Sequence, residues 1–103
     1  MNRRSTHRAC VYHVVSNIPS GKVSTYGRIA KVCGMKSSRE VGRILHENPD
    51  PKEIPCHRVV HSDGSIAVGY AFGGRKKQIE ILGKEGILIV NGKVQTLNTI
   101  VYP

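Results

Sequence analysis

The chain has 103 residues and a formal net charge of +9, with 16 lysines and arginines against 7 aspartates and glutamates. Its length fits one small domain, so we expect residues 1–103 to form a single domain, and the 39% share of hydrophobic residues excludes a disordered chain. No apolar run of about 18 residues is present, which excludes a membrane span.

The charge predicts a polyanionic partner, most simply nucleic acid. A well-solvated basic surface, or packing on RNA like that of ribosomal proteins, has the same composition. Charge alone therefore leaves these alternatives open.

Three amphipathic helices are expected in the first half of the chain. The first covers residues 5–17, where the turn sequence "IPSGK" follows it. The second begins near Ser24 or Thr25 and stops at Gly34. The third starts after residue 37 or 38 and carries its apolar residues on one face: Val41, Ile44 and Leu45.

The second and third helices, joined by "VCGMKSS", predict a helix-turn-helix. The polar face of the third helix bears Arg39, Arg43 and His46. Basic side chains at this place favour DNA binding.

The second half of the chain contains loops, one helix and one hairpin. "NPDPKEIPC" predicts an extended connection, "HRVVHSDGS" a short strand followed by a turn, and "GYAFGGRKKQ" a glycine-rich loop leading into a helix that closes at Gly86. "ILIVNGKVQTL" predicts a β-hairpin around Asn91-Gly92. The expected fold is mainly α with a small β-hairpin, of the helix-turn-helix or winged-helix-like type.

Three cysteines occur, Cys10, Cys33 and Cys56, with no CxxC pair. This odd number argues against disulfides and fits a reducing cytoplasm, or a nucleus in a eukaryote. We expect Cys10 and Cys33 to be packing residues of helices. Cys10 and His13 have helical i, i+3 spacing, but no second pair accompanies them, so no metal site is predicted.

The stretch "PCHRV" predicts a reactive Cys56. A cysteine attacks as the thiolate, and His57 and Arg58 supply a base and a positive charge within two residues. Adjacent side chains diverge, so His57 would act through a bridging water or a sharp local turn, and its other ring nitrogen would need an orienting carboxylate. The alternative is a small buried hydrophobic cysteine.

Together with "VSTYGRIA", "SSREVGRILHENP" and "GGRKKQIEILGKEG", the stretch "IPCHRVV" resembles the C-terminal domain of the O6-alkylguanine-DNA alkyltransferases, also called methylated-DNA–protein-cysteine methyltransferases. The match runs in order from about residue 9 to residue 87. The resemblance implies that Cys56 accepts an alkyl group from the guanine oxygen in one irreversible turnover. It also implies that His57 is the water-mediated base and Glu85 its orienting carboxylate, and that no cofactor is used.

The resemblance implies further roles along the chain. Tyr26 rotates a phosphate and donates towards the purine, Arg39 fills the gap left by the flipped base, and Asn48 ties the helix-turn-helix to the active-site loop. The resemblance also implies further DNA contacts at Lys36, Ser38 and Arg43. It implies that the walls of the base pocket are formed by Pro55, Val59, Tyr70, Ala71 and Phe72. The implied partner is double-stranded DNA, bound by a monomer through the minor groove.

Two features depart from the family. Many members have Tyr-Ser before the paired glycines, where this chain has Ala71-Phe72. The compact length and terminal hairpin also resemble the alkyltransferase-like proteins, which bind the lesion without repair, recruit nucleotide excision repair and have lost the cysteine. The retained Cys56, His57 and Glu85 favour transfer, and a lesion sensor is the alternative. A plain winged-helix DNA binder explains the charge but not "PCHRV".

Overall fold

The computed structural model describes residues 3–66, 70 and 72–95. Four α-helices dominate it, which confirms the predicted mainly helical class. The elements in chain order are α1 (Arg3–Ser16), β1 (Ser24–Thr25), α2 (Tyr26–Val32), α3 (Ser38–His46), the 3-10 turn η1 (Cys56–Arg58), β2 (Val59–Val60), α4 (Gly74–Lys84), β3 (Ile89–Val90) and β4 (Lys93–Val94). No helix in these residues is long and apolar enough to cross a membrane.

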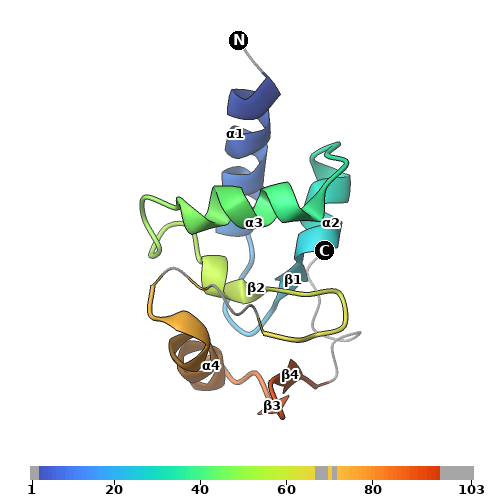
Figure 1. The fold of residues 1–103 in the computed structure, drawn as a ribbon. Coiled ribbons are helices and arrows are strands. Elements are labelled where there is room, and N and C mark those ends of the chain that lie inside the picture. Colours follow the sequence, from blue (N-terminus) through green and yellow to red (C-terminus); the bar gives the residue numbers. More distant parts are fainter. Residues whose placement is uncertain (1–2, 67–69, 71, 96–103) are drawn as a thin grey trace.

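The helices α1, α2 and α3 lie together at one end of the molecule, and α4 with the β3–β4 hairpin lies at the other (Figure 1). Each end has its own cluster of buried side chains. The first cluster includes Val11, Val15, Ile29, Val41, Leu45 and Cys56, and the second Val23, Val60, Ile66, Leu82, Ile87 and Val94. The short parallel pair β1–β2, with Ser24 opposite Val59, lies between the two ends.

The helix-turn-helix consists of α2 and α3. Thr25 caps α2, because its hydroxyl accepts a hydrogen bond of 3.1 Å from the backbone N–H of Arg28. We expected the helix to begin near Ser24 or Thr25, and its first residue is Tyr26 because both of those residues pair with β2. The predicted stop at Gly34 is confirmed: its φ of 67° is the left-handed conformation that ends helices.

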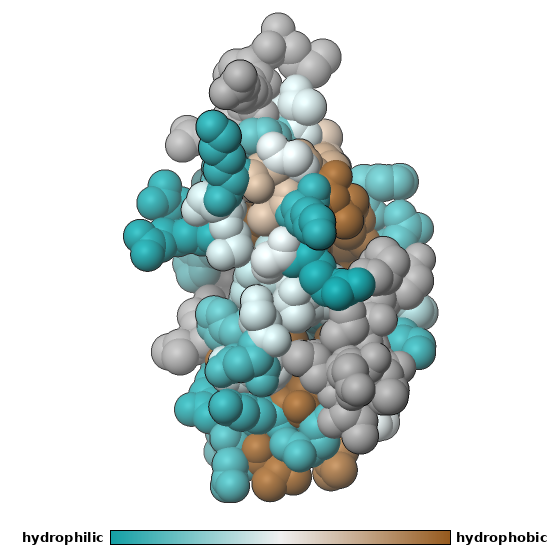
Figure 2. All heavy atoms as spheres, turned by 90° about the vertical axis from the view of Figure 1, so that its right-hand side faces the viewer, coloured by the Kyte–Doolittle hydropathy of each residue, from teal (hydrophilic) through white to brown (hydrophobic). Residues whose placement is uncertain are grey.

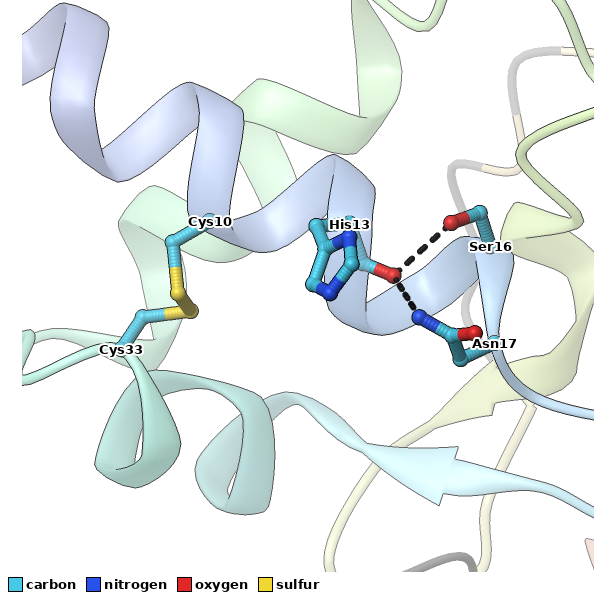
Figure 3. Close-up of a disulfide and its surroundings, with 5 residues drawn as sticks. All are labelled: Cys10, His13, Ser16, Asn17 and Cys33. Atoms are coloured by element: carbon cyan, nitrogen blue, oxygen red, sulfur yellow. Dashed lines mark hydrogen bonds between the residues drawn. A yellow bond between two sulfur atoms is a disulfide. The ribbon is translucent and has the colours of Figure 1, made fainter.

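Cys10 and Cys33 form a disulfide that joins α1 to the C-terminal end of α2 (Figure 3). Our expectation that both are reduced packing residues is therefore wrong. Their Cα atoms are 5.8 Å apart because α1 packs beside α2, a contact between residues 23 positions apart. With these two paired, Cys56 is the free cysteine of the described residues.

The hairpin forms at the predicted Asn91-Gly92 turn. Asn91 has a φ of 51° and Gly92 a φ of 74°, the positive values that a two-residue turn of this kind needs. The hairpin is attached to the segment after β2 by two backbone hydrogen bonds, Ile66 N–H to Gly92 O and Val94 N–H to Gly64 O, of 3.0 and 2.8 Å.

Candidate active site and DNA-facing surface

Cys56 is the first residue of the 3-10 turn η1 and is only 5% exposed. The turn is closed by a hydrogen bond of 2.9 Å from the backbone N–H of Arg58 to the carbonyl of Pro55, itself buried. This is the sharp local turn that the sequence offered as one of two possibilities. A 3-10 turn places successive side chains about 120° apart, so His57 points away from the cysteine.

Asn48 links the end of α3 to the Cys56 turn. Its side-chain amide donates to the carbonyl of Ile54 at 2.7 Å, and its side-chain oxygen accepts from the backbone N–H of Asp50 at 2.9 Å. Asn48 is 6% exposed, so these bonds satisfy a buried amide. The side chain thus connects the helix-turn-helix to the loop that precedes Cys56.

The Cys56 thiol is protonated more readily than an exposed thiol. Burial raises its pKa, and hydrogen bonding from the Asn48 side chain and from the backbone lowers it by less. We expected Arg58 to favour the thiolate, but its guanidinium binds Glu85, and His57 binds the same carboxylate through one ring nitrogen. The free protein therefore holds a neutral thiol, which needs a base in order to react.

Glu85, the C-terminal cap of α4, accepts hydrogen bonds from both His57 and Arg58. His57 Nε2 lies 3.0 Å from Glu85 Oε2, as the resemblance implied. Arg58 Nη2 lies 2.6 Å from the same oxygen, and Arg58 Nε lies 3.0 Å from Oε1. The three side chains are 9 to 17% exposed.

The pKa values of His57 and Glu85 are both lowered, but for different reasons. Burial lowers the pKa of His57, and the Glu85 carboxylate raises it by less, so the imidazole is neutral at pH 7. Burial raises the pKa of Glu85, but hydrogen bonds from Arg58 and then His57 outweigh burial, and the pKa falls below its usual value. A neutral imidazole beside an ionised carboxylate is the state that a general base needs.

Gln78 of α4 also contacts the Cys56 turn, and the sequence analysis missed it. Its amide nitrogen donates to the carbonyls of His57 at 2.9 Å and Val59 at 3.1 Å, and its side chain is fully buried. One sequence signal existed: Gln78 lies four residues before the buried Leu82, so a polar side chain occupies the apolar face of α4.

The aromatic residues expected at the base pocket belong to the cluster that contains Cys56. Tyr26, Tyr70 and Phe72 are partly buried against it, and Val59 is fully buried within it. Burial, and secondarily the charge of the Cys56 thiolate, raises the pKa of Tyr26 to about 12 and raises that of Tyr70. Ala71 lies outside the described residues.

Two of the expected DNA contacts, Arg39 and Arg43, lie on the face of α3 opposite its buried residues, while Ser38 is the first residue of the helix and Lys36 precedes it. Lys36, Ser38, Arg39 and Arg43 are exposed, while Val41, Ile44 and Leu45 are buried. Figure 2 views the molecule from the side on which α2 lies, and hydrophilic side chains cover much of that face, with hydrophobic ones in its upper half and at its lower end. The described residues contain no cluster of three or more His, Cys, Asp or Glu side chains that could hold a metal ion.

Residues 6–87 match the family model of the 6-O-methylguanine DNA methyltransferase DNA-binding domain. The chain is 46% identical over 77 residues to a methylated-DNA–protein-cysteine methyltransferase of Methanothermobacter thermautotrophicus, covering 75% of this chain and 42% of that protein. It is 41% identical over 85 residues to a bifunctional methyltransferase/endonuclease of Picrophilus torridus, covering 82% of this chain and 28% of that protein. The chain thus spans less than half the length of these two relatives.

A second kind of relative matches over more of its length. Alkyltransferase-like protein 1 of Schizosaccharomyces pombe is 41% identical over 80 residues, covering 77% of this chain and 74% of that protein. The crystal structure of S. pombe Atl1 in complex with damaged DNA containing O6-carboxymethylguanine superimposes with a TM-score of 0.84 at 32% identity, covering 100% of this chain and 99% of that one.

Proposed function

Since this chain belongs to the O6-methylguanine DNA methyltransferase family by its DNA-binding domain, we propose that it takes the alkyl group of an O6-alkylguanine in duplex DNA onto Cys56. The observation that carries the proposal is the free Cys56 next to a His57–Glu85 pair joined at 3.0 Å. Alkyl transfer requires a thiol and a base, and lesion binding alone requires neither.

The proposed reaction is one displacement. His57 accepts the Cys56 proton through a bridging water, with Nδ1 as the accepting atom because Nε2 faces Glu85. The sulfur then attacks the alkyl carbon, a C–S bond forms, the C–O bond breaks, and its electron pair remains on the guanine oxygen. A proton from the Tyr26 hydroxyl converts the leaving group to neutral guanine, the solvent returns a proton to Tyr26, and the His57 imidazolium releases the cysteine proton to the solvent. The alkylated cysteine is not regenerated, so each molecule acts once.

The base must leave the helix to reach Cys56. Flipping costs about a few kcal/mol, and a side chain inserted in the vacated place offsets part of it. We propose Arg39, exposed at the start of α3, for this insertion, and Lys36, Ser38 and Arg43 for the phosphates. We propose Asn48 as the link between α3 and the Cys56 turn, and Pro55, Val59, Tyr70, Ala71 and Phe72 as walls of the base pocket.

Mass spectrometry of the intact protein tests this proposal. The chain is incubated with a duplex that contains one O6-methylguanine, next to a Cys56→Ser variant and an undamaged duplex. We expect a gain of one methyl group on the wild type alone, mapped to Cys56. Peptide mapping also reports the Cys10–Cys33 pair, which should remain unmodified because it is oxidised.

The second candidate function is a lesion sensor without transfer. The full-length structural match to S. pombe Atl1, with a TM-score of 0.84, favours it. Tight binding of the lesion duplex with no change of protein mass would support the sensor, which would then recruit nucleotide excision repair proteins, and would exclude transfer.

A further inference from the structure

Arg58 binds the Glu85 carboxylate more extensively than His57 does. Its guanidinium makes three contacts with Glu85, Nη2 to Oε2 at 2.6 Å, Nε to Oε1 at 3.0 Å and Nε to Oε2 at 3.2 Å. His57 makes one, at 3.0 Å to Oε2. The oxygen that orients the imidazole is therefore shared with a fixed positive charge.

This arrangement places a carboxylate where the fold disfavours it. Glu85 is 13% exposed and caps the C-terminal end of α4, where the helix dipole repels a negative charge. Arginine stays protonated throughout the physiological pH range. Arg58 and Glu85 together therefore have no net charge, and His57 faces an ion pair instead of a lone carboxylate.

Whether His57 faces a lone carboxylate or an ion pair affects how readily its imidazole is protonated as the pH falls. A lone buried carboxylate would attract a proton to the adjacent imidazole and convert it to imidazolium, which cannot accept the cysteine proton. A carboxylate neutralised by Arg58 exerts less of this attraction while it still fixes the ring through Oε2. The guanidinium charge, close to the ring, disfavours imidazolium as well.

We propose that Arg58 is a positioning residue that, together with burial, keeps the His57 imidazole neutral, and so able to act as the base, below neutral pH as well as above it. This inference rests on the proposed transfer to Cys56 for its consequence, although the proton equilibrium of His57 exists without any substrate. It assigns a role in the acid–base chemistry to the Arg of "PCHRV", which donates to the Glu85 carboxylate.

A purely structural role for Arg58 has to be separated from this one. Arg58 Nη1 also donates to the carbonyl of Ile18 at 2.7 Å, which ties the segment after α1 to the site. Loss of that bond lowers stability. It does not by itself change the pH at which His57 titrates.

The test follows the His57 ring by NMR in the free protein as the pH is lowered. The chain has five histidines, so a His57→Gln spectrum assigns the signal, and the other four serve as internal references. Arg58→Gln removes the positive charge but keeps an amide donor. Arg58→Lys keeps the charge but cannot make the paired hydrogen bonds of a guanidinium. The control, Lys76→Met, removes an exposed charge from α4. We expect the His57 midpoint to rise in the order wild type, Arg58→Lys, Arg58→Gln, with Lys76→Met equal to wild type.

The single-turnover transfer rate should follow the same order. Relative to the rate at pH 8, we expect the rate of Arg58→Gln to fall further than that of wild type as the pH is lowered. The difference should approach about tenfold at pH values below both midpoints, as an upward shift of one pH unit in the acid limb requires. A folded Arg58→Gln that titrates His57 like wild type overturns the inference. If Arg58→Gln does not fold, an Arg58→Lys midpoint equal to that of wild type overturns it.

The two proposals fail separately in this design. If the wild type transfers no methyl group, the proposed function is wrong, while the titration midpoints of His57 measured by NMR still test the inference about Arg58. A wild type that transfers normally, with unchanged midpoints in folded variants, sinks the inference alone.

Discussion

At the scale of single residues, three buried polar side chains contact or belong to the Cys56 turn, and each has its own hydrogen-bond partners. Asn48 binds the loop before the turn, Gln78 binds two carbonyls of the turn and of β2, and His57 binds Glu85. A buried polar group without a partner costs about 1–3 kcal/mol, so these bonds hold the turn in one conformation. The Cys56 sulfur is thereby fixed relative to both ends of the molecule.

Asn48→Ala should lower the free energy of unfolding by about 1–3 kcal/mol, because the Ile54 carbonyl and the Asp50 N–H lose their partner. Urea denaturation measures the loss. Asn17→Ala is the matched control, since Asn17 is exposed and donates to the carbonyl of His13 (Figure 3), and we expect a change within about 0.5 kcal/mol. Equal effects of the two substitutions would contradict the linking role of Asn48.

Acidification should destabilise the protein through His57 and Glu85. Both pKa values are lower in the folded protein than the ordinary values of 6.5 and 4.5, so the unfolded chain binds more protons at acid pH. The contribution of His57 is complete above pH 6.5 and is lost as the pH falls through its folded pKa, and that of Glu85 follows below pH 4.5. Denaturation from pH 8 to pH 4 measures this. His57→Gln should flatten the first part of the decline, and an unchanged profile would count against the neutral buried imidazole.

At the scale of elements, the Cys10–Cys33 disulfide links the short helix α2 to the longer helix α1. α2 has only seven residues, which is too few for an isolated helix to be stable in water. Its stability depends on the Thr25 cap, on burial of Ile29 and Ala30, and on the link to α1. The disulfide therefore supports the first helix of the helix-turn-helix directly.

Reduction of this disulfide should lower the free energy of unfolding by about 3 kcal/mol, the loop-closure entropy of a cross-link between residues 23 positions apart. Denaturant unfolding with and without dithiothreitol measures the difference. A Cys10→Ser/Cys33→Ser double variant should resemble the reduced wild type and should not respond to the reductant. A response of that variant would mean that the reductant acts elsewhere.

For the whole molecule, the proposed contact with DNA rests on the net charge of +9 and on the position of α3. The buried residues of α3 attach it to the first core cluster, and its exposed basic residues face outward. Phosphate contacts of this type give sequence-independent affinity that falls with salt, which suits a protein that searches for damage.

Salt titration of DNA binding should identify the phosphate contacts. Arg43→Ala should reduce the slope of log K against log salt by about one, as for one lost phosphate contact. Lys84→Ala removes the same charge from the C-terminal turn of α4, where Lys84 is 75% exposed and pairs with Glu80, and should leave the slope unchanged. Fluorescence anisotropy with an undamaged duplex measures both. Equal slopes for the two variants would place the DNA away from α3.

The sequence by itself determined the parts of this protein that depend on neighbours along the chain. Hydrophobic periodicity predicted the helices, Gly34 predicted the end of α2, and Asn91-Gly92 predicted the hairpin, because each effect acts over a few residues. The motif "PCHRV" singled out Cys56, and the resemblance built on it predicted the His57–Glu85 pair, which the distance of 3.0 Å confirms.

Only the tertiary structure decided the contacts between distant residues. The pairing of Cys10 with Cys33, the β1–β2 pair, the bonds from Gln78 to the Cys56 turn and the attachment of Arg58 to Glu85 all join segments that lie far apart in sequence. Arg58 shows the reason most clearly. Its charge was expected to act on the Cys56 thiol, but its Nε and Nη2 atoms donate to the Glu85 carboxylate 27 residues further along, and its Nη1 atom donates to the Ile18 carbonyl. The packing of α4 decides which partner it reaches.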